Sequence, residues 1–228
     1  MRYSQAIGSK GSQKHFQQLV NDSADRLGNE IRQLAGFEMD EEIIWKSPIA
    51  DHKYAEYRDK KSLEVLGMQE ATKLHSLTDF WPLGGPQWDA LAQTNKQKNI
   101  LVEAKSHIGE LKSTCGAKNP ASIQKIQKAL NATKAYFGSN GQNDWSIGYY
   151  QYANRLAHLY WLRAINSVDA HLVFVYFVND TQMKGSQNEW KTEIAKVHAY
   201  LGLNSLPDYV HDVFIEVSSV QSVSSILL

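Results

Sequence analysis

Two acidic residues and a lysine, which together can hold a metal ion and activate water, are close together in the sequence. Asp89 follows Trp88 in a short segment, and Glu103 and Lys105 are separated by one residue in the aliphatic run that begins at Ile100. Side chains two positions apart on a strand point to the same face, so Glu103 and Lys105 are expected to share one. An adjacent antiparallel strand ending at Asp89 would bring its carboxylate opposite that of Glu103.

Two carboxylates held together repel each other and need a cation between them. Hard oxygen ligands suit Mg²⁺ or Mn²⁺. Such an ion binds a phosphate, acidifies a water molecule and stabilises the leaving oxygen. A neighbouring lysine, here Lys105, adds a compact positive charge that orients the water and offsets charge on the phosphoryl oxygens. The pattern therefore predicts a catalytic Asp89, Glu103 and Lys105 site.

The tripeptide acid-x-lysine has little specificity by itself, because it occurs five times in the chain, at Asp51, Asp59, Glu103, Glu110 and Glu189. Only the copy at Glu103 follows an aliphatic strand-like run and has an acid at the end of a preceding strand-like segment. The alternative is that all three residues are solvated charges at the end of a hairpin, where ion pairs contribute little. The surrounding apolar residues favour burial, and buried charge without a partner is costly.

The elements that would position these residues follow from hydrophobic periodicity and from turn and cap residues. Their order predicts one α/β domain over residues 1–228, with a mixed central β-sheet flanked by helices. We expect helices over Ser12–Leu34, Tyr57–Leu66, Pro120–Phe137, Trp145–Ile165 (with Asp144 as its cap) and Gln187–Leu201, and strands over Glu42–Ile49, Gln87–Ala92, Ile100–Ala104, Ala170–Val178 and Asp212–Val217.

Two of the predicted helices carry polar residues on otherwise apolar faces. In the helix Trp145–Ile165, Gln151, Arg155 and His158 fall on one narrow face, which needs polar partners if it is buried and faces water if it is not. In the first helix, Glu30 projects within the apolar stripe. It is either an acid that contributes to the site or a half-exposed residue near the helix end.

The chain has a formal net charge of +0, with 24 basic and 24 acidic residues. That balance argues against a protein that coats nucleic acid by bulk electrostatics. Five lysines without an intervening acid nevertheless lie between Lys112 and Asn143. Three of them, Lys118, Lys125 and Lys128, are expected either to contact nucleic-acid phosphates or to form the solvated side of an amphipathic helix.

The Asp89 and Glu103-x-Lys105 motif resembles that of the PD-(D/E)XK nuclease superfamily, which has the restriction-endonuclease-like fold, and the resemblance covers roughly residues 12 to 178. It implies that Asp89 and Glu103 bind Mg²⁺ and that Lys105 assists the attacking water. It also implies that the Ala104 carbonyl and Glu30 are further ligands. Gln151-x-x-x-Arg155 resembles a second motif of some branches, close to the active site. Trp88 stands where the family often has the proline before the aspartate.

We therefore expect a Mg²⁺- or Mn²⁺-dependent nuclease whose partner is nucleic acid, with DNA as the favoured substrate. The alternatives are a nuclease fold that binds nucleic acid or assembles without turnover, and a hydrolase of small phosphorylated molecules. A cytoplasmic location without membrane contact is expected, because the apolar runs are short and the single Cys115 cannot form an internal disulfide. A homodimer is possible through aromatic surface of the helix Trp145–Ile165.

Overall fold

A five-stranded mixed sheet forms the centre of the molecule, whose computed structural model describes residues 3–180 and 185–218. The strands lie in chain order, with β1–β2–β3 antiparallel and β3–β4–β5 parallel. This arrangement confirms the predicted α/β class with a mixed sheet flanked by helices. The strands are β1 (Ile43–Ser47), β2 (Ala90–Thr94), β3 (Asn99–Lys105), β4 (Ala170–Val178) and β5 (Val210–Glu216).

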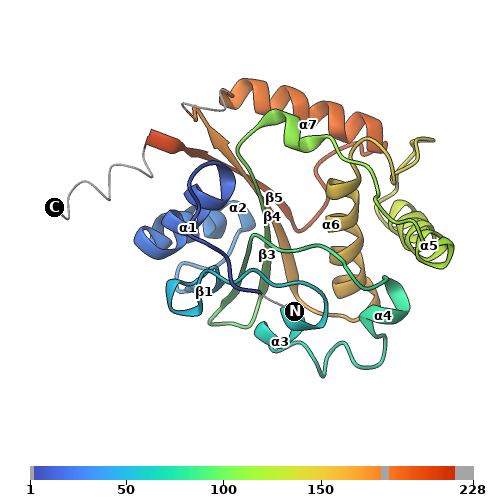
Figure 1. Cartoon of the computed structure of the whole chain (residues 1–228), viewed down its shortest axis with the longest axis horizontal. Helices are drawn as coiled ribbons and strands as arrows, with labels where there is room; N and C mark the ends of the chain where they lie inside the picture. The colour runs from blue at the N-terminus through green and yellow to red at the C-terminus, as the bar shows by residue number, and fades with distance from the viewer. Residues whose placement is uncertain (1–2, 181–184, 219–228) are drawn as a thin grey trace.

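Helices cover both faces of this sheet (Figure 1). On one face lie α1 (Gly11–Asp22) and α2 (Ala24–Ala35). On the other lie α6 (Tyr150–Tyr160) and α7 (Gln187–Leu201), with α5 (Pro120–Tyr136) packed on the outer side of α6. The strand β4 is buried on both sides, so it reads as a continuous apolar run. Successive side chains of β4 alternate between the hydrophobic cores on the two faces of the sheet.

Short elements occupy the connections around the sheet. They are η1 (Ala50–His52), α3 (Asp59–Val65), α4 (Leu77–Phe80) and η2 (Ile108–Leu111). The helix α4 lies beside the end of α6 and against α5 (Figure 1). Of these four, only α3 was predicted, as part of Tyr57–Leu66.

The predicted single helix over Ser12–Leu34 is wrong, because Ser23 leaves helical geometry with φ −148° and ψ 36° and separates α1 from α2. The neighbouring Asn21 holds the break in place. Its side chain donates to the carbonyl of Pro48 at 2.9 Å and accepts from the amide of Ala50 at 2.9 Å. The chain turns here to follow the sheet surface, which the continuous apolar stripe did not reveal.

The predicted helix Trp145–Ile165 begins later than expected. Asp144 accepts from the amide of Ser146 at 2.8 Å and so caps a local turn, and Gly148 has φ +77°, a conformation that ends any helix. The α-helix starts at Tyr150, and its last turn, η3 (Trp161–Ile165), is π-helical. The helices predicted over Pro120–Phe137 and Gln187–Leu201 are confirmed, with Asn119 capping the former.

Among the helices of the described residues, none combines the length and apolarity needed to cross a membrane.

Candidate functional site

The pairing of β2 with β3 brings Asp89 opposite Glu103. Ala90 pairs with Val102 and Leu91 with Leu101. Extending this register by one residue places Asp89 opposite Glu103. Leu91 and Leu101 both enter the core beneath α6, and Asp89 and Glu103 follow them on the same face. Oδ2 of Asp89 accepts from the amide of Ala104 at 2.7 Å, which fixes the carboxylate at the end of the strand pair.

Glu103 binds two cationic side chains and is only 3% exposed. Nζ of Lys105 contacts Oε1, and the guanidinium of Arg155 contacts Oε2 through two nitrogens, one of them Nε at 2.8 Å. Lys105 and Arg155 are buried as well. The three side chains form an ion-pair cluster inside the protein between β3 and α6.

The polar stripe of α6 faces this cluster and not the solvent. Oε1 of Gln151 accepts from Nζ of Lys105 at 3.0 Å, and the amide of Gln151 donates to Oγ of Ser113 at 2.8 Å, which fixes the start of the helix. His158 donates from Nδ1 to the carbonyl of Asn154 at 2.8 Å, and its burial lowers its pKa to about 3. Sequence periodicity therefore identified the helix face that meets the sheet.

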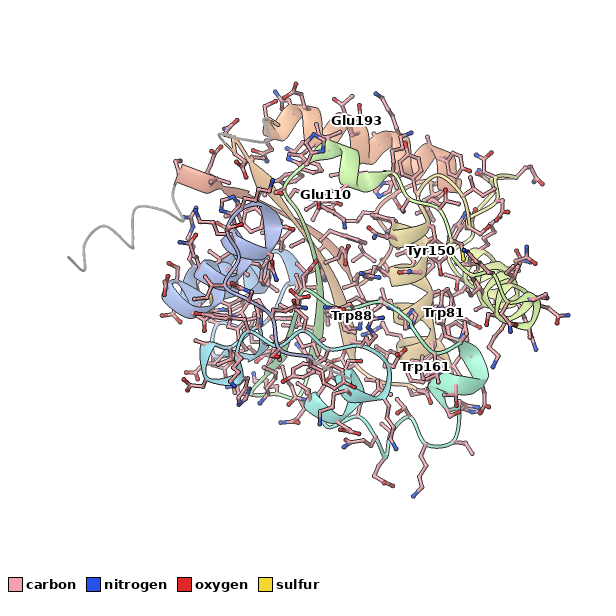
Figure 2. The ribbon with its side chains drawn as sticks, in the orientation of Figure 1. Trp81, Trp88, Glu110, Tyr150, Trp161 and Glu193 are labelled. Carbon is pink, nitrogen blue, oxygen red and sulfur yellow. The ribbon has the colours of Figure 1, made fainter. Side chains whose placement is uncertain are left out.

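Trp88 and Gln87 complete the surroundings of Arg155. The guanidinium carbon lies 5.0 Å from the centre of the Trp88 ring, and one guanidinium nitrogen donates to the Gln87 carbonyl at 3.0 Å. Figure 2 shows Trp88 between the strands and α6. Arg155 therefore contacts the ring of Trp88, the carbonyl of Gln87 and the carboxylate of Glu103. A planar guanidinium with several N–H donors suits this combination of partners.

The two facing carboxyl groups differ in their electrostatic surroundings. Burial and the negative charge of Glu103 raise the pKa of Asp89 to about 8, so Asp89 keeps its proton at neutral pH in the metal-free protein. Burial alone would raise the pKa of Glu103 as well, but the positive charges of Arg155 and Lys105 have the larger effect and lower this pKa. A cation beside Asp89 would be needed to ionise both groups.

A third acid near the site, Glu56, was missed by the sequence analysis. Its Oε2 accepts from Nε2 of Gln87 at 2.7 Å and from Nε2 of Gln5 at 3.2 Å. Its pKa is raised by burial and by the charge of Glu103, so its carboxyl group lies within electrostatic reach of the cluster. Glu56 follows β1 by nine residues in an irregular segment, where no periodicity marks it.

Two further predicted ligands have different outcomes. Glu30 is exposed on α2, which packs against the face of the sheet opposite Glu103, so the structure does not bring Glu30 together with Glu103. The Ala104 amide points to Asp89. Because the N–H and C=O of one strand residue point to the same side, the Ala104 carbonyl is also directed to the side of β3 where Asp89 lies.

The predicted phosphate-binding lysines lie apart from the ion-pair cluster. Lys118 is exposed just before α5, and Lys125 and Lys128 project from α5 itself, which packs on the outer side of α6. Nζ of Lys125 donates to the carbonyl of Thr78 at 2.6 Å. The helix α6 therefore separates these lysines from Glu103.

A hydrated divalent cation needs fewer protein ligands than an ion caged only by protein groups. Among residues 3–180 and 185–218, no group of three or more His, Cys, Asp or Glu side chains could hold a metal ion. Mg²⁺ commonly keeps several waters and takes one or two carboxylates from the protein. Asp89, Glu103 and the Ala104 carbonyl are the groups that could hold such an ion, and the oxygens of Glu103 would be shared between this ion, Lys105 and Arg155.

Comparison of the chain with family models, with curated proteins and with solved structures finds no match in any of the three. The chemistry of the cluster itself is therefore the basis for a function.

Proposed function

We propose that this protein is a Mg²⁺-dependent nuclease that hydrolyses phosphodiester bonds of nucleic acid, with DNA as the favoured substrate. The observation that carries the proposal is the facing pair Asp89 and Glu103 with Lys105 bound to Glu103 at the end of two antiparallel strands. The raised pKa of Asp89 supports it, because this carboxyl group ionises at neutral pH only beside a further positive charge.

The order of elements supports a restriction-endonuclease-like fold. Helices α1 and α2 precede three antiparallel strands, and α5 and α6 then lead to β4, which is parallel to β3. The PD-(D/E)XK resemblance implies this succession of helix, strands, helix and strand. Glu103 and Lys105 lie on β3, and Asp89 directly precedes β2, which supports the resemblance.

Each side chain has a role that its contacts support. Asp89, Glu103 and the Ala104 carbonyl would hold Mg²⁺, which supplies a Lewis acid for the phosphate and for the attacking water. Nζ of Lys105 contacts one oxygen of Glu103, and Gln151 fixes this Nζ. Arg155 keeps the Glu103 carboxylate in place. Lys105 is then available to orient a water molecule and to offset charge that develops on the phosphoryl oxygens.

The test is a cleavage assay on linear, circular and single-stranded DNA and on RNA, with Mg²⁺, Mn²⁺ or EDTA. Wild type should cut at least one substrate with Mg²⁺ or Mn²⁺ and none with EDTA, and Glu103→Gln should abolish cutting. Glu110→Gln is the matched control, because Glu110 belongs to the next acid-x-lysine copy and lies outside the cluster. Cleavage by Glu103→Gln at the wild-type rate would refute the proposal.

One observation favours a second candidate, a nucleic-acid-binding or assembly protein without turnover. Both oxygens of Glu103 are already paired, with Lys105 and with Arg155, so its charge is balanced without a metal ion. In that case DNA binding should persist in EDTA, Glu103→Gln should lower stability more than binding, and none of the substrates should be cut.

A further inference from the structure

A cavity of about 320 Å³ lies between α4, α5 and the end of α6. Phe80 and Tyr160 supply half-buried aromatic rings to its wall, and the buried ring of Trp161 lies behind them, with Phe80 6.0 Å from Tyr160 and 6.4 Å from Trp161 between ring centres. Nε1 of Trp161 donates to the carbonyl of His75 at 3.1 Å, which fixes that ring. Figure 2 shows Trp161 at the end of α6 nearest α4.

This cavity is distinct from the ion-pair cluster. Tyr160 follows Arg155 by five residues, so it projects about 140° around the helix from the side chain that binds Glu103. The cavity volume is at the lower end of the range for ligand sites, roughly 300 to 1,000 Å³. It therefore suits one small planar ligand.

Two lysines of α5, Lys125 and Lys128, also line the cavity. They are three residues apart and so project from the same side of the helix. The bond from Lys125 to the Thr78 carbonyl holds its ammonium group between α5 and α4. The carboxylate of the cavity, Asp79, accepts from Oγ of Ser76 at 2.7 Å. Among the salt bridges of the described residues, none involves either lysine, and the bond of Lys125 to a neutral carbonyl leaves its charge unbalanced, so both charges are available to an anion.

The local backbone supports a binding role for this region. Trp161 and Ile165, at the two ends of the π-helical turn η3, both line the cavity. Single π-helical turns occur frequently at functional sites, and η3 is such a turn at the C-terminal end of α6. Here the turn follows Tyr160 directly and lies under the same cavity.

We propose that the cavity binds one nucleotide, with its base against the aromatic wall and its phosphate at Lys125 and Lys128. A phosphate ion alone would leave the rings of Phe80 and Tyr160 in contact with water, and an uncharged base would leave the lysines without a counter-charge. Stacking on aromatic side chains accepts any base, and the lysines accept the charge of its phosphate. The nucleotide is either free or one unpaired residue of a single strand. The proposal extends beyond the nuclease function and does not depend on it.

The test is calorimetry on the full chain in EDTA with four probes: AMP, adenosine, inorganic phosphate and the 12-mer of deoxyadenylate. AMP should bind wild type at least tenfold more tightly than adenosine or phosphate. Lys128→Gln should weaken AMP binding about tenfold, because it removes a charge-assisted contact. Tyr160→Leu should weaken it about fivefold or more through lost stacking. Lys191→Gln is the matched control, since Lys191 is exposed on α7 outside the cavity, and it should bind AMP like wild type.

The outcomes separate the two ligand sources and the two proposals. Tighter binding of the 12-mer than of AMP, weakened by Lys128→Gln, identifies a strand as the ligand, and equal affinity identifies a free nucleotide. Lys128 is exposed, so Lys128→Gln should fold like wild type. This variant therefore still tests the proposal if Tyr160→Leu fails to fold. Unchanged AMP affinity in Lys128→Gln, or absence of AMP binding, overturns the inference. Absence of cleavage by wild type refutes the nuclease alone, since these measurements require no metal or turnover.

Discussion

Arg155 of α6 binds Glu103 of β3 through two guanidinium nitrogens, and both side chains are buried. The contact joins a helix to the centre of the sheet across 52 residues of sequence. A buried ion pair is costly to break from one side, because the remaining charge has lost its partner and cannot reach water. Arg155 therefore has a structural role as well as a place beside the candidate metal ligands.

Replacing Arg155 with Met should lower the free energy of unfolding by about 3–5 kcal/mol, because Glu103 keeps only Lys105 as a counter-charge. Urea unfolding at pH 7 measures this. The control is Lys196→Met, which removes an exposed i,i+3 pair with Glu193 and should cost less than about 0.5 kcal/mol. Equal midpoints for wild type and Arg155→Met would show that the pair carries no stability.

Replacing Lys105 with Met removes a charge and a donor but keeps most of the aliphatic stem. If the proposed role is right, cleavage should slow by about 10²–10⁴-fold, because water orientation and charge stabilisation are lost. Mn²⁺ binding should persist, since the lysine is not a ligand. Lys112→Met is the matched control, because this exposed lysine ends the neighbouring acid-x-lysine copy. A normal rate for Lys105→Met would remove Lys105 from the mechanism.

The raised pKa of Asp89 predicts a pH dependence of stability in EDTA. The unfolded chain releases this proton near the ordinary pKa of 3.8, whereas the folded protein keeps it until about pH 8. The folded state therefore binds more protons between these values, and its stability falls as pH rises. The side chain at position 89 of the variant Asp89→Asn does not titrate. The free energy of unfolding of Asp89→Asn minus that of wild type should therefore increase from pH 5 to pH 8, by at most about 1.4 kcal/mol per pH unit. Parallel pH profiles of the two proteins would contradict the raised pKa.

The lysines near α5 predict a salt dependence of DNA binding. If Lys118, Lys125 and Lys128 each touch a phosphate of a duplex, the slope of log affinity against log salt should flatten by about 2–3 units in the triple Gln variant. Binding is measured by fluorescence anisotropy with Ca²⁺ in place of Mg²⁺. An unchanged slope would mean that duplex DNA reaches the site without these lysines.

The sequence was most informative where burial imposed a pattern. The alternation of β2 and β3 was enough to predict Asp89 opposite Glu103, and the narrow polar face of α6 predicted that Gln151 and Arg155 have polar partners. Both follow from local geometry, since the period of an element determines which residues share a face. Arg155 as the partner of Glu103 required the packing of α6 on the sheet, which periodicity does not specify.

The failures occurred where long-range contacts determine the conformation. The bonds of Asn21 to the segment Pro48–Ala50 accompany the break between α1 and α2, and they join positions nearly 30 residues apart. The apolar stripe of one long helix predicts a place for Glu30 in the site, whereas α2 packs on the other face of the sheet. Glu56 was missed because it lies in an irregular segment and depends on Gln5 and Gln87 for its place.

The most direct test of the account is Mn²⁺ binding by calorimetry to wild type and Asp89→Asn across a pH series. Mn²⁺ must displace the proton of Asp89, so wild-type affinity should rise about tenfold from pH 6 to pH 7 and level off above about pH 8. Asp89→Asn should bind at least tenfold more weakly and lose this dependence on pH. Equal Mn²⁺ affinity of the two proteins at every pH would contradict a metal site built on Asp89 and Glu103.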